Sequence, residues 1–239
     1  MDKQEKIQHF GVWIKKSDGN KISRDNYAII DKKCSTWSPR IADMMKAIYK
    51  TPEERQKHYD DAECKIYSDS FCEEWRKKCL ANFDLNMAFF HQISKEDFED
   101  KLQKLLKSNK KIRQIFDLDE CKGKNGIYIM VLDEYKQAYI GQSQDIRRRI
   151  MQHWSNRKPF DRLIFGNANH SVLSIDCFGA LDTTRIYVLE TTSFNTSEKI
   201  AVNKMPPQYR LNRIGGGTVN NTFDFLEVLS EFNSRNFGK

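Results

Sequence analysis

The sequence lacks the features that mark membrane, secreted and fibrous proteins. It contains no run of about 18 apolar residues that would span a bilayer, and its first residues include no apolar stretch of a signal peptide. Only five prolines are present, and no internal repeat or low-complexity segment is visible, so collagen-like, coiled-coil and mucin-like chains are excluded. We therefore expect a soluble, cytoplasmic protein without a membrane partner.

Cysteine motifs for metal binding are also missing. No two cysteines have the two-residue separation of the CxxC pairs found in zinc sites. A chain of this length does not need disulfides to hold its core, and the expected compartment is reducing. We therefore expect reduced thiols and no zinc site. The six cysteines are Cys34, Cys64, Cys72, Cys79, Cys121 and Cys177.

The composition is that of a folded protein with a polar surface. Hydrophobic residues make up 39% of the chain and aromatic residues 12%, while 31% are charged and the mean hydropathy is -0.72. The 239 residues suffice for one large domain or two small ones. The 40 Lys and Arg exceed the 33 Asp and Glu by seven, which fits a polyanionic partner but is also common in proteins that bind none.

The first 118 residues are predicted to form a mostly helical module, with helical patterns dominant after about residue 40. Thr51 and Pro52 have the N-cap and first-turn signature of one helix, and Ser94 is the predicted N-cap of another. The apolar residues that recur at helical spacing after Ser94 are Phe98, Leu102, Leu105, Leu106, Ile112 and Phe116.

A different pattern follows in the second half. The apolar run 126–132 and the segment 138–141 are predicted to form a β-hairpin, and Ser143 is the predicted cap of a helix that starts immediately afterwards. The remaining predicted elements are strands at 171–178 and 185–189, a helix at 195–205, an exit loop at 211–217 and a closing helix at 223–237. We therefore divide the chain into a helical module, 1–118, whose role is target recognition, a partner surface or a scaffold, and a domain, 119–239.

The hairpin carries two tripeptides in which tyrosine and glycine occupy defined places. Gly-Ile-Tyr stands at 126–128 and Tyr-Ile-Gly at 139–141, and Arg149 and His153 follow four residues apart on the next helix. Together with a glutamate on a later helix and an asparagine beyond it, this pattern resembles the GIY-YIG nuclease superfamily over about 126–217. The resemblance implies an α+β fold with a small sheet flanked by helices, and hydrolysis of a phosphodiester with a divalent metal, Mg²⁺ or Mn²⁺.

The resemblance also implies roles for the motif residues. Tyr128 would be the general base or would position the water, with Tyr139 in support. Arg149 would neutralise charge that grows on the phosphate oxygens, and His153 belongs to the same set. A tyrosine base is unusual because the free phenol has a pKa of about 10, so a nearby cation is needed, and Arg149 or the metal would supply one.

The metal ligand has two candidates. Glu190 ends a predicted strand and Glu198 begins a predicted helix, so both are placed near the site. The family carries its glutamate on the helix, and by this resemblance we assign the metal to Glu198. Asn212 matches the late asparagine of the family, which orients the site. A lone carboxylate would hold a hard ion such as Mg²⁺ with most of its water retained.

Basic residues are concentrated where the site is expected. Between Lys136 and Arg213 there are twelve Lys and Arg against six Asp and Glu, a local net charge of +6, which fits a nucleic-acid footprint. Taken singly, each site residue also has an ordinary structural explanation, such as a sheet aromatic or a helix-end charge. Taken in register, they predict an endonuclease, with DNA as the expected substrate. The alternative is a catalytically idle nucleic-acid-binding or regulatory protein that retains the nuclease fold.

Overall fold

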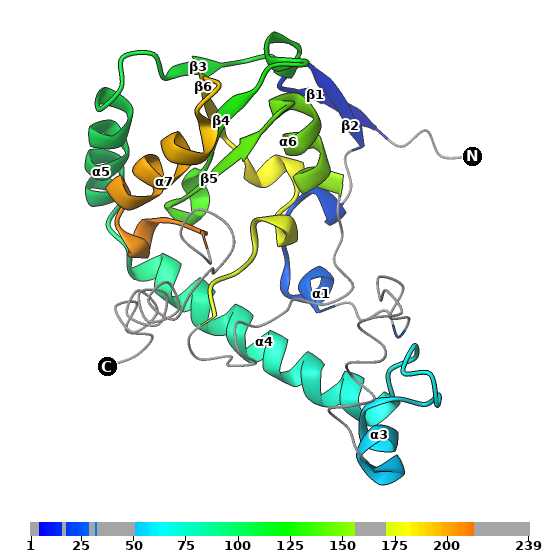
Figure 1. The fold of residues 1–239 in the computed structure, drawn as a ribbon. Helices are drawn as coiled ribbons and strands as arrows, with labels where there is room; N and C mark the ends of the chain where they lie inside the picture. Colours follow the sequence, from blue (N-terminus) through cyan, green and yellow to red (C-terminus); the bar gives the residue numbers. More distant parts are fainter. Residues whose placement is uncertain (1–4, 16–17, 29–31, 33–50, 156–170, 213–239) are drawn as a thin grey trace.

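A four-stranded antiparallel sheet lies at the centre of the computed structural model, which describes residues 5–15, 18–28, 32, 51–155 and 171–212 (Figure 1). The strand order is β3-β6-β4-β5, so the strand that carries the first tyrosine motif is internal to the sheet. The strands are β3 (Arg113–Ile115), β4 (Gly126–Leu132), β5 (Gln137–Ser143) and β6 (Arg185–Glu190).

Strands β4 and β5 form the predicted hairpin. Their register pairs Tyr128 with Gly141 and Met130 with Tyr139, and the connection is a short 3₁₀ turn, η3 (Asp133–Tyr135). Every residue of β4 is buried because the strand is covered on both faces. Alternation along the strand therefore sends neighbouring side chains into two different cores.

One face of the sheet is covered by two helices, α5 (Lys95–Lys107) and α7 (Phe194–Lys204), which lie on the same side in Figure 1. Ser94 caps α5 as predicted, with its hydroxyl accepting from the backbone N–H of Asp97 at 3.1 Å. The core on this face is aliphatic and aromatic; among its buried members are Phe98, Leu102, Leu105, Ile127, Ile129, Val131, Ala201 and Val202. We call it the apolar face.

The opposite face is covered by α6 (Ile146–Ser155), by the long helix α4 (Asp69–Gln92) and by the short helix α1 (Arg24–Tyr27). Its core combines apolar side chains with tyrosines; the buried members contributed by the two central strands and α6 are Tyr128, Met130, Leu132, Ile146, Ile150, Ile186 and Val188. We call it the tyrosine face.

The remaining elements are short and lie around this sandwich. Helix α3 has the predicted Thr51 cap, whose hydroxyl accepts from the backbone N–H of Glu54 at 3.2 Å. The N-terminal hairpin was not predicted. These elements are β1 (Lys6–His9), β2 (Val12–Lys15), α3 (Pro52–His58), and the 3₁₀ turns η1 (Asp18–Asn20), η2 (Leu118–Cys121), η5 (Ile175–Cys177), η6 (Ala180–Asp182) and η7 (Pro207–Tyr209).

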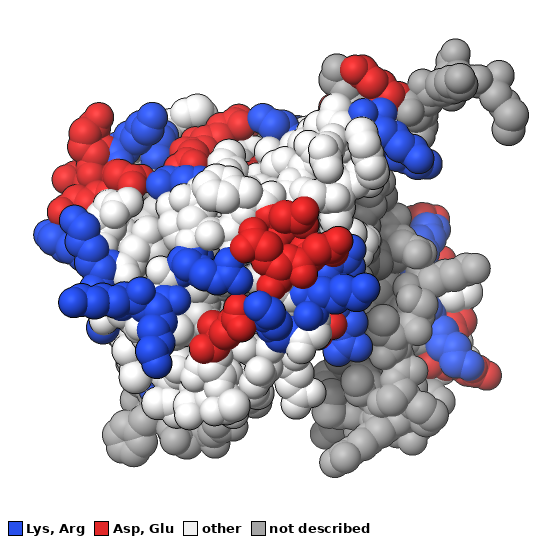
Figure 2. Space-filling model, turned by 90° about the horizontal axis from the view of Figure 1, so that it is seen from above, with Lys and Arg blue, Asp and Glu red and all other residues white. Residues whose placement is uncertain are grey.

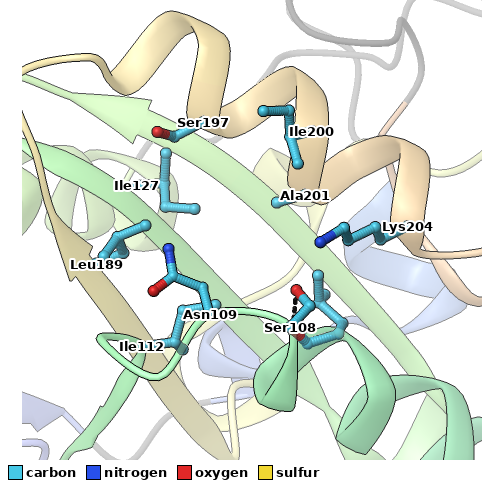
Figure 3. Close-up of a pocket in the computed structure, with 10 residues that line it drawn as sticks. Ser108, Asn109, Ile112, Ile127, Leu189, Ser197, Ile200, Ala201 and Lys204 are labelled. Carbon is cyan, nitrogen blue, oxygen red and sulfur yellow. Dashed lines mark hydrogen bonds between the residues drawn. The ribbon is translucent and has the colours of Figure 1, made fainter.

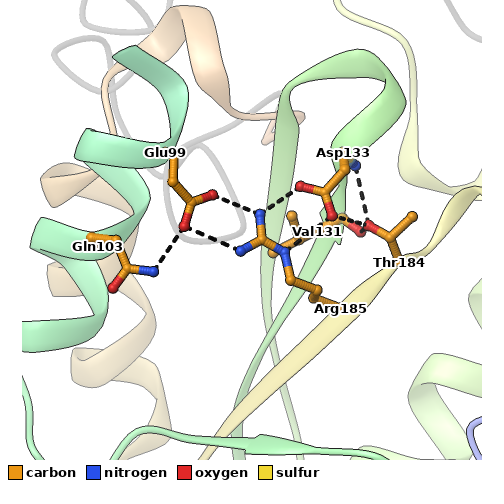
Figure 4. Close-up of polar contacts among 6 residues, drawn as sticks. All are labelled: Glu99, Gln103, Val131, Asp133, Thr184 and Arg185. Carbon is orange, nitrogen blue, oxygen red and sulfur yellow. Dashed lines mark hydrogen bonds and ion pairs between the residues drawn. The ribbon is translucent and has the colours of Figure 1, made fainter. Parts of the chain in front are cut away.

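An ion-pair network ties α5 to the hairpin and to β6 (Figure 4). The guanidinium of Arg185 donates to Glu99 of α5 at 2.8 Å and to Asp133 at the hairpin turn at 3.0 Å. Gln103, one turn after Glu99, donates to the same carboxylate at 2.8 Å. Burial of Arg185 opposes its charge, but the two carboxylates raise its pKa overall. The network therefore joins residues on both sides of the predicted domain boundary.

The prediction of a separate helical unit at 1–118 is wrong for the described residues. Strand β3 pairs with β6, so the sheet is shared across residue 118, and α5 forms part of the core beneath β4. The helix after Ser94 ends at Lys107 rather than continuing to Phe116, which is 72% exposed. Sequence periodicity extended the helix too far because Ile115 is buried as part of a strand.

The predicted strand at 171–178 is also wrong. Residues 171–174 have no regular structure and 175–177 form the 3₁₀ turn η5. The apolar alternation there reflects burial of an irregular segment, which α4 holds through Asn82 and Asn86; both side-chain amides donate to the backbone carbonyl of Ser171, at 2.7 and 2.9 Å. The predicted closing helix at 223–237 and the end of the exit loop lie outside the described residues.

The predictions of reduced cysteines and of no membrane-spanning segment can be compared with the described part of the chain. Five of the six cysteines are described there, and all five are free thiols. None of the helices in the described ranges combines the length and the hydropathy needed to cross a membrane.

Candidate active site

The first motif tyrosine lies at the centre of the tyrosine face. Tyr128 is fully buried on β4, and its ring lies across Gly141 on the neighbouring strand. A Cβ atom at position 141 would come within 2.4 Å of the Tyr128 hydroxyl oxygen, so only glycine leaves room for the ring. The first position of the other motif also requires glycine. Gly126 has φ +155°, and a Cβ there would collide with the backbone carbonyl of Leu189.

A chain of hydrogen bonds extends from this tyrosine. The Tyr128 hydroxyl lies 2.7 Å from Nε2 of His153, and Nδ1 of His153 lies 2.5 Å from Oδ1 of Asp176. His153 is buried on α6, and Asp176 comes from η5. A strand residue, a helix residue and a turn residue therefore form a linear Tyr-His-Asp array in the interior.

The second motif tyrosine completes the aromatic cluster. The ring centroid of Tyr139 lies 6.2 Å from that of Tyr128 and 5.2 Å from that of His153. Burial raises the pKa of Tyr139 to about 12, and the charge of Glu198 acts in the same direction. Both phenols are therefore protonated at neutral pH.

Arg149 supplies the positive charge of the site. It lies one turn before His153 on α6, so the two side chains emerge from the same helical face, as predicted. Burial raises the pKa of Tyr128 well above its usual value, with a further increase from Tyr139, while the Arg149 guanidinium beside it acts in the opposite direction. Arg149 is therefore placed to favour the phenolate that burial disfavours.

Glu198 is the buried carboxylate of the site. It lies in the second turn of α7, and the charge it carries raises the pKa of both motif tyrosines. Its Oε2 atom is buried without a hydrogen-bond partner, and burial raises its pKa to about 7. An unsatisfied buried carboxylate oxygen is costly, and either protonation or a cation that pairs with it would relieve that cost.

Glu190 has a different environment. Its side chain is 41% exposed at the end of β6, where Oε1 accepts from Arg113 at 3.1 Å and from Lys124 at 3.0 Å. These two cations lower the pKa of Glu190, Lys124 having the larger effect. Of the two predicted candidates, Glu190 therefore belongs to a surface ion-pair cluster, and Glu198 lies beside the tyrosines.

Asn212 holds the free edge of the hairpin. Its side-chain amide donates to the backbone carbonyl of Ile140 at 2.7 Å and its oxygen accepts from the Ile140 N–H at 3.1 Å. The backbone N–H of Leu211 donates to the carbonyl of Ala138 at 2.8 Å. Asn212 and Leu211 thus hold the backbone on the two sides of Tyr139, Asn212 at Ile140 and Leu211 at Ala138.

The donor set limits which metal the site suits. Within the described ranges, no three His, Cys, Asp or Glu side chains converge as a metal-binding group. Glu198 is the carboxylate of the site with an orphaned oxygen, which suits a hard cation that keeps most of its water and takes further oxygens from a substrate. Mg²⁺ or Mn²⁺ fits this donor set, whereas a zinc site with several nitrogen or sulfur ligands does not.

Some of the basic residues around the site are engaged by contacts within the fold. Arg185 is engaged by two carboxylates, and buried Arg210 donates to the backbone carbonyls of Val202 and Met205. Figure 2 shows Lys and Arg interspersed with Asp and Glu on the face above the sheet, rather than one continuous basic patch. Two acids of the same segment, Asp182 and Glu198, are buried as well, so burial removes charges of both signs from the count.

A pocket of about 170 Å³ lies on the apolar face and is separate from this site (Figure 3). Its walls come from α5, α7 and the inner strands, with Ile127, Leu189 and Ala201 among the lining residues and Lys204 at one side. Ile127 and Tyr128 are neighbours on β4 and point to opposite faces. The pocket therefore has no access to the tyrosines.

Sequence analysis missed one member of the array, Asp176. The segment around it was predicted as a strand, in which a single aspartate has no special meaning. Ser174 caps the turn, with its hydroxyl accepting from the Asp176 N–H at 3.4 Å. This Ser-x-Asp turn signature is the local signal that would have argued against a strand.

Comparison with known protein families gives a match to part of the chain. Residues 124–199 match the family model of the GIY-YIG catalytic domain. The match spans the hairpin, α6, β6 and α7 up to Glu198, and confirms the resemblance noted in the sequence for this part of the chain. Asn212 lies beyond the matched residues. No curated protein and no solved structure matches the chain.

Proposed function

From the GIY-YIG catalytic domain at 124–199, which supports a nuclease-type function, we propose that this protein is a divalent-metal-dependent endonuclease that hydrolyses phosphodiester bonds in DNA. The observation that carries the proposal is the Tyr128 hydroxyl, which lies 2.7 Å from His153 and is flanked by a cation, Arg149, and a carboxylate, Glu198. These are the groups that attack by water on a phosphate requires.

The residues divide the chemistry between them. The Tyr128 oxygen receives a proton from the attacking water as its own proton passes to Nε2 of His153. Arg149 neutralises the charge that grows on the non-bridging phosphate oxygens, and Tyr139 supports Tyr128 and His153 from the same aromatic cluster. The high pKa of a tyrosine base is then no obstacle, because the phenol passes its own proton to His153 and a free phenolate does not have to accumulate.

Glu198 is the residue that would hold the metal. A bound Mg²⁺ or Mn²⁺ would supply charge neutralisation and assist departure of the leaving oxygen. Burial keeps Glu198 close to the tyrosines, and its pKa of about 7 means that cation and proton compete for the same oxygen near neutral pH.

DNA is the proposed substrate because the domain acts on nucleic acid and the exposed charge near the site is basic. Arg148 and Lys199 are exposed on the two helices that flank the hairpin. Contacts from such residues bind phosphates without reading sequence. We therefore expect binding that weakens steeply with salt.

The test is incubation of the purified full chain with supercoiled plasmid, in Mg²⁺ and in EDTA, with gel detection of nicked and linear products. The proposal expects cleavage in Mg²⁺, none in EDTA, and none by the Tyr128→Phe protein in either. A parallel incubation with RNA of matched length tests the substrate class. Plasmid binding without metal-dependent cleavage would instead support the idle nucleic-acid-binding alternative.

A further inference from the structure

We propose that Asp176 is a positioning residue that holds His153 in the tautomer with the proton on Nδ1, so that Nε2 is free to accept the proton of Tyr128. The catalytic consequence of this assignment rests on the proposed function. The tautomer does not, and is measurable in a protein that never cuts DNA. Neither the sequence motifs nor the roles implied by the family resemblance include Asp176.

The geometry of the array supports the assignment. The two distances, 2.7 Å from Tyr128 to Nε2 and 2.5 Å from Nδ1 to Asp176, are both those of short hydrogen bonds. The His153 side chain is 1% exposed and that of Asp176 14% exposed. Both ring nitrogens therefore have their bonds inside the protein, where the alternatives offered by bulk water are restricted.

The inventory of donors and acceptors determines the direction of each bond. An ionised aspartate only accepts, so the nitrogen facing Asp176 must carry a proton. Arg149 only donates, so the Tyr128 oxygen accepts on that side and has one proton to give. In neutral His153, the remaining nitrogen is Nε2, which faces this proton. One arrangement satisfies all groups at once: Tyr128 donates to Nε2 and Nδ1 donates to Asp176.

The proton balance of the step follows from this arrangement. Water loses one proton to the Tyr128 oxygen, and the original Tyr128 proton moves to Nε2 of His153. The histidine becomes an imidazolium, and the Asp176 carboxylate, which stays ionised, stabilises that charge. This is the logic by which an aspartate orients and supports the histidine of a serine-hydrolase triad.

The fold supplies the precision that a positioning residue needs. Asp176 lies on η5, capped by Ser174, and the carbonyl of Ser171 at the start of this segment is held by two asparagines of α4. Helix α4 is part of the N-terminal half, outside the residues that match the family. The segment that leads to Asp176 is therefore held by a helix outside the residues that match the family.

The first experiment measures the tautomer. The full chain is labelled with ¹⁵N-histidine, and the His153 ring signals are identified among the five histidines by their loss in His153→Gln. We expect the Nδ1–H tautomer in the wild type, and an increase of the Nε2–H form in Asp176→Asn, because the asparagine amide can donate to Nδ1. An Nε2–H tautomer in the wild type, or a His153 spectrum unchanged in Asp176→Asn, would overturn the assignment.

The second experiment measures the consequence for cleavage. For Asp176→Asn we expect kcat to fall by roughly 100-fold or more with KM changed only a few-fold, since the wrong tautomer blocks proton transfer and leaves substrate binding intact. Asp176→Glu, which keeps the carboxylate, should recover part of the loss. The matched control is Asp119→Asn, which removes an exposed ion pair with Arg147 of the same helix and should cut within about two-fold of the wild type.

These two experiments separate the two claims. If the wild type does not cut but shows the Nδ1–H tautomer that Asp176→Asn disturbs, the positioning stands and the proposed function fails. If the wild type cuts and Asp176→Asn retains its full kcat, the positioning role is wrong and the proposed function stands.

Discussion

The two faces of the central sheet use the same strand for different purposes. From β4, Ile127, Ile129 and Val131 enter a core closed by α5 and α7, while Tyr128 and Met130 enter the core beneath α6 and α4. The apolar face contains hydrophobic contacts that any well-packed side chains of the same volume would supply. The tyrosine face adds a short polar array whose members must meet within hydrogen-bond distance.

This difference has an energetic cause. Apolar contacts are non-directional and tolerate small displacements of the side chains. A buried hydroxyl, imidazole or carboxylate instead destabilises the fold unless a hydrogen-bond partner is aligned with it. The tyrosine face is therefore held by more than packing: Asn212 fixes β5, Asn82 and Asn86 of α4 fix the segment before Asp176, and Gly141 leaves room for the Tyr128 ring. Substitutions on the tyrosine face should consequently reduce activity, whereas substitutions on the apolar face should reduce stability.

The largest effect is expected from the two residues at the reacting end of the array. Tyr128→Phe removes the proton-accepting oxygen, and Arg149→Ala removes the charge that stabilises the transition state, so each should lower the cleavage rate by about 1,000-fold. The folded state should persist in both, with a loss of roughly 1 kcal/mol in the free energy of unfolding for Tyr128→Phe. Single-turnover cleavage and denaturant unfolding measure the two quantities. Wild-type rates in both variants would disprove the site assignment.

The second largest effect is expected at Glu198, and it distinguishes Glu198 from Glu190 as the metal ligand. Glu198→Gln keeps the shape but removes the charge that would hold the metal, so cleavage should fall by at least about 100-fold while DNA binding persists. Glu190→Gln alters a surface ion-pair cluster and should cut nearly normally. Cleavage assays with a titration of Mg²⁺ measure both. The reverse outcome would assign the metal to Glu190.

The same substitution has a stability consequence with a defined pH window. The Glu198 carboxyl has a pKa of about 7 in the folded protein, above its unfolded value of 4.5, so the folded state binds the proton more tightly. Stability of the metal-free wild type relative to Glu198→Gln should therefore fall as pH rises from about 4.5 to 7. Urea unfolding of both proteins in EDTA across this range checks the sign.

On the apolar face we expect stability to fall without loss of the intrinsic activity. Leu102→Ala, at a fully buried position of α5, should lower the free energy of unfolding by about 3 kcal/mol because it leaves a cavity. Cleavage by the folded fraction, measured well below the unfolding midpoint, should remain within about two-fold of the wild type. A large loss of cleavage in this folded protein would show that the two faces are coupled.

The smallest effect concerns a second buried carboxylate of the tyrosine face, remote from the array. Asp182 accepts from the backbone N–H groups of Ile22 and Gly179, both at 2.8 Å, and from the Tyr135 hydroxyl at 2.9 Å. Burial raises its pKa from 3.8 to about 6, which the hydrogen bonds only partly offset, so its ionised form opposes folding. Asp182→Asn can retain all three bonds, since its amide can donate to Tyr135, and should equal or exceed wild-type stability at pH 8.

The contrast with alanine sharpens this prediction. Asp182→Ala leaves two backbone donors and a buried hydroxyl without partners, so it should lose roughly 2–4 kcal/mol. The stability advantage of Asp182→Asn over the wild type should grow from pH 4 to pH 6, because over this range the carboxyl has lost its proton in the unfolded state but still binds it in the folded state. Thermal unfolding at several pH values tests both. An Asn variant as unstable as the Ala variant would show that the charge itself is required.

Several local features were predictable because they depend on neighbours in the chain. The hairpin at 126–143 follows from alternating apolar residues around a turn, and the caps at Thr51 and Ser94 form as their sequences predict. The spacing of Arg149 and His153 placed them on one helical face. One cap was misassigned: Asp145, not Ser143, accepts from the first-turn N–H of Arg148, at 3.0 Å, because Asp145 immediately precedes the helix and Ser143 lies two residues further away.

The predictions that were wrong concern features that depend on contacts between residues distant in sequence. A three-residue strand such as β3 is too short to show a period, and it forms because β6 offers an unpaired edge. The segment 171–178 has the apolar residues of a strand but no partner strand, and α4 holds it instead. Asp176 was invisible for this reason, since the meaning of a lone aspartate depends on what it faces.

The amino-acid sequence was sufficient to predict the chemical groups of the candidate site, a phenol, a cation and a carboxylate, and their spacing within one hairpin and two helices. Local geometry is enough for this, because strand and helix periods follow from the backbone. The folded arrangement was needed to distinguish buried Glu198 from exposed Glu190 and to show that an aspartate from an irregular segment reaches His153. These choices depend on burial and on contacts between elements far apart in the chain, where a charge is stable only if the whole fold supplies its partner.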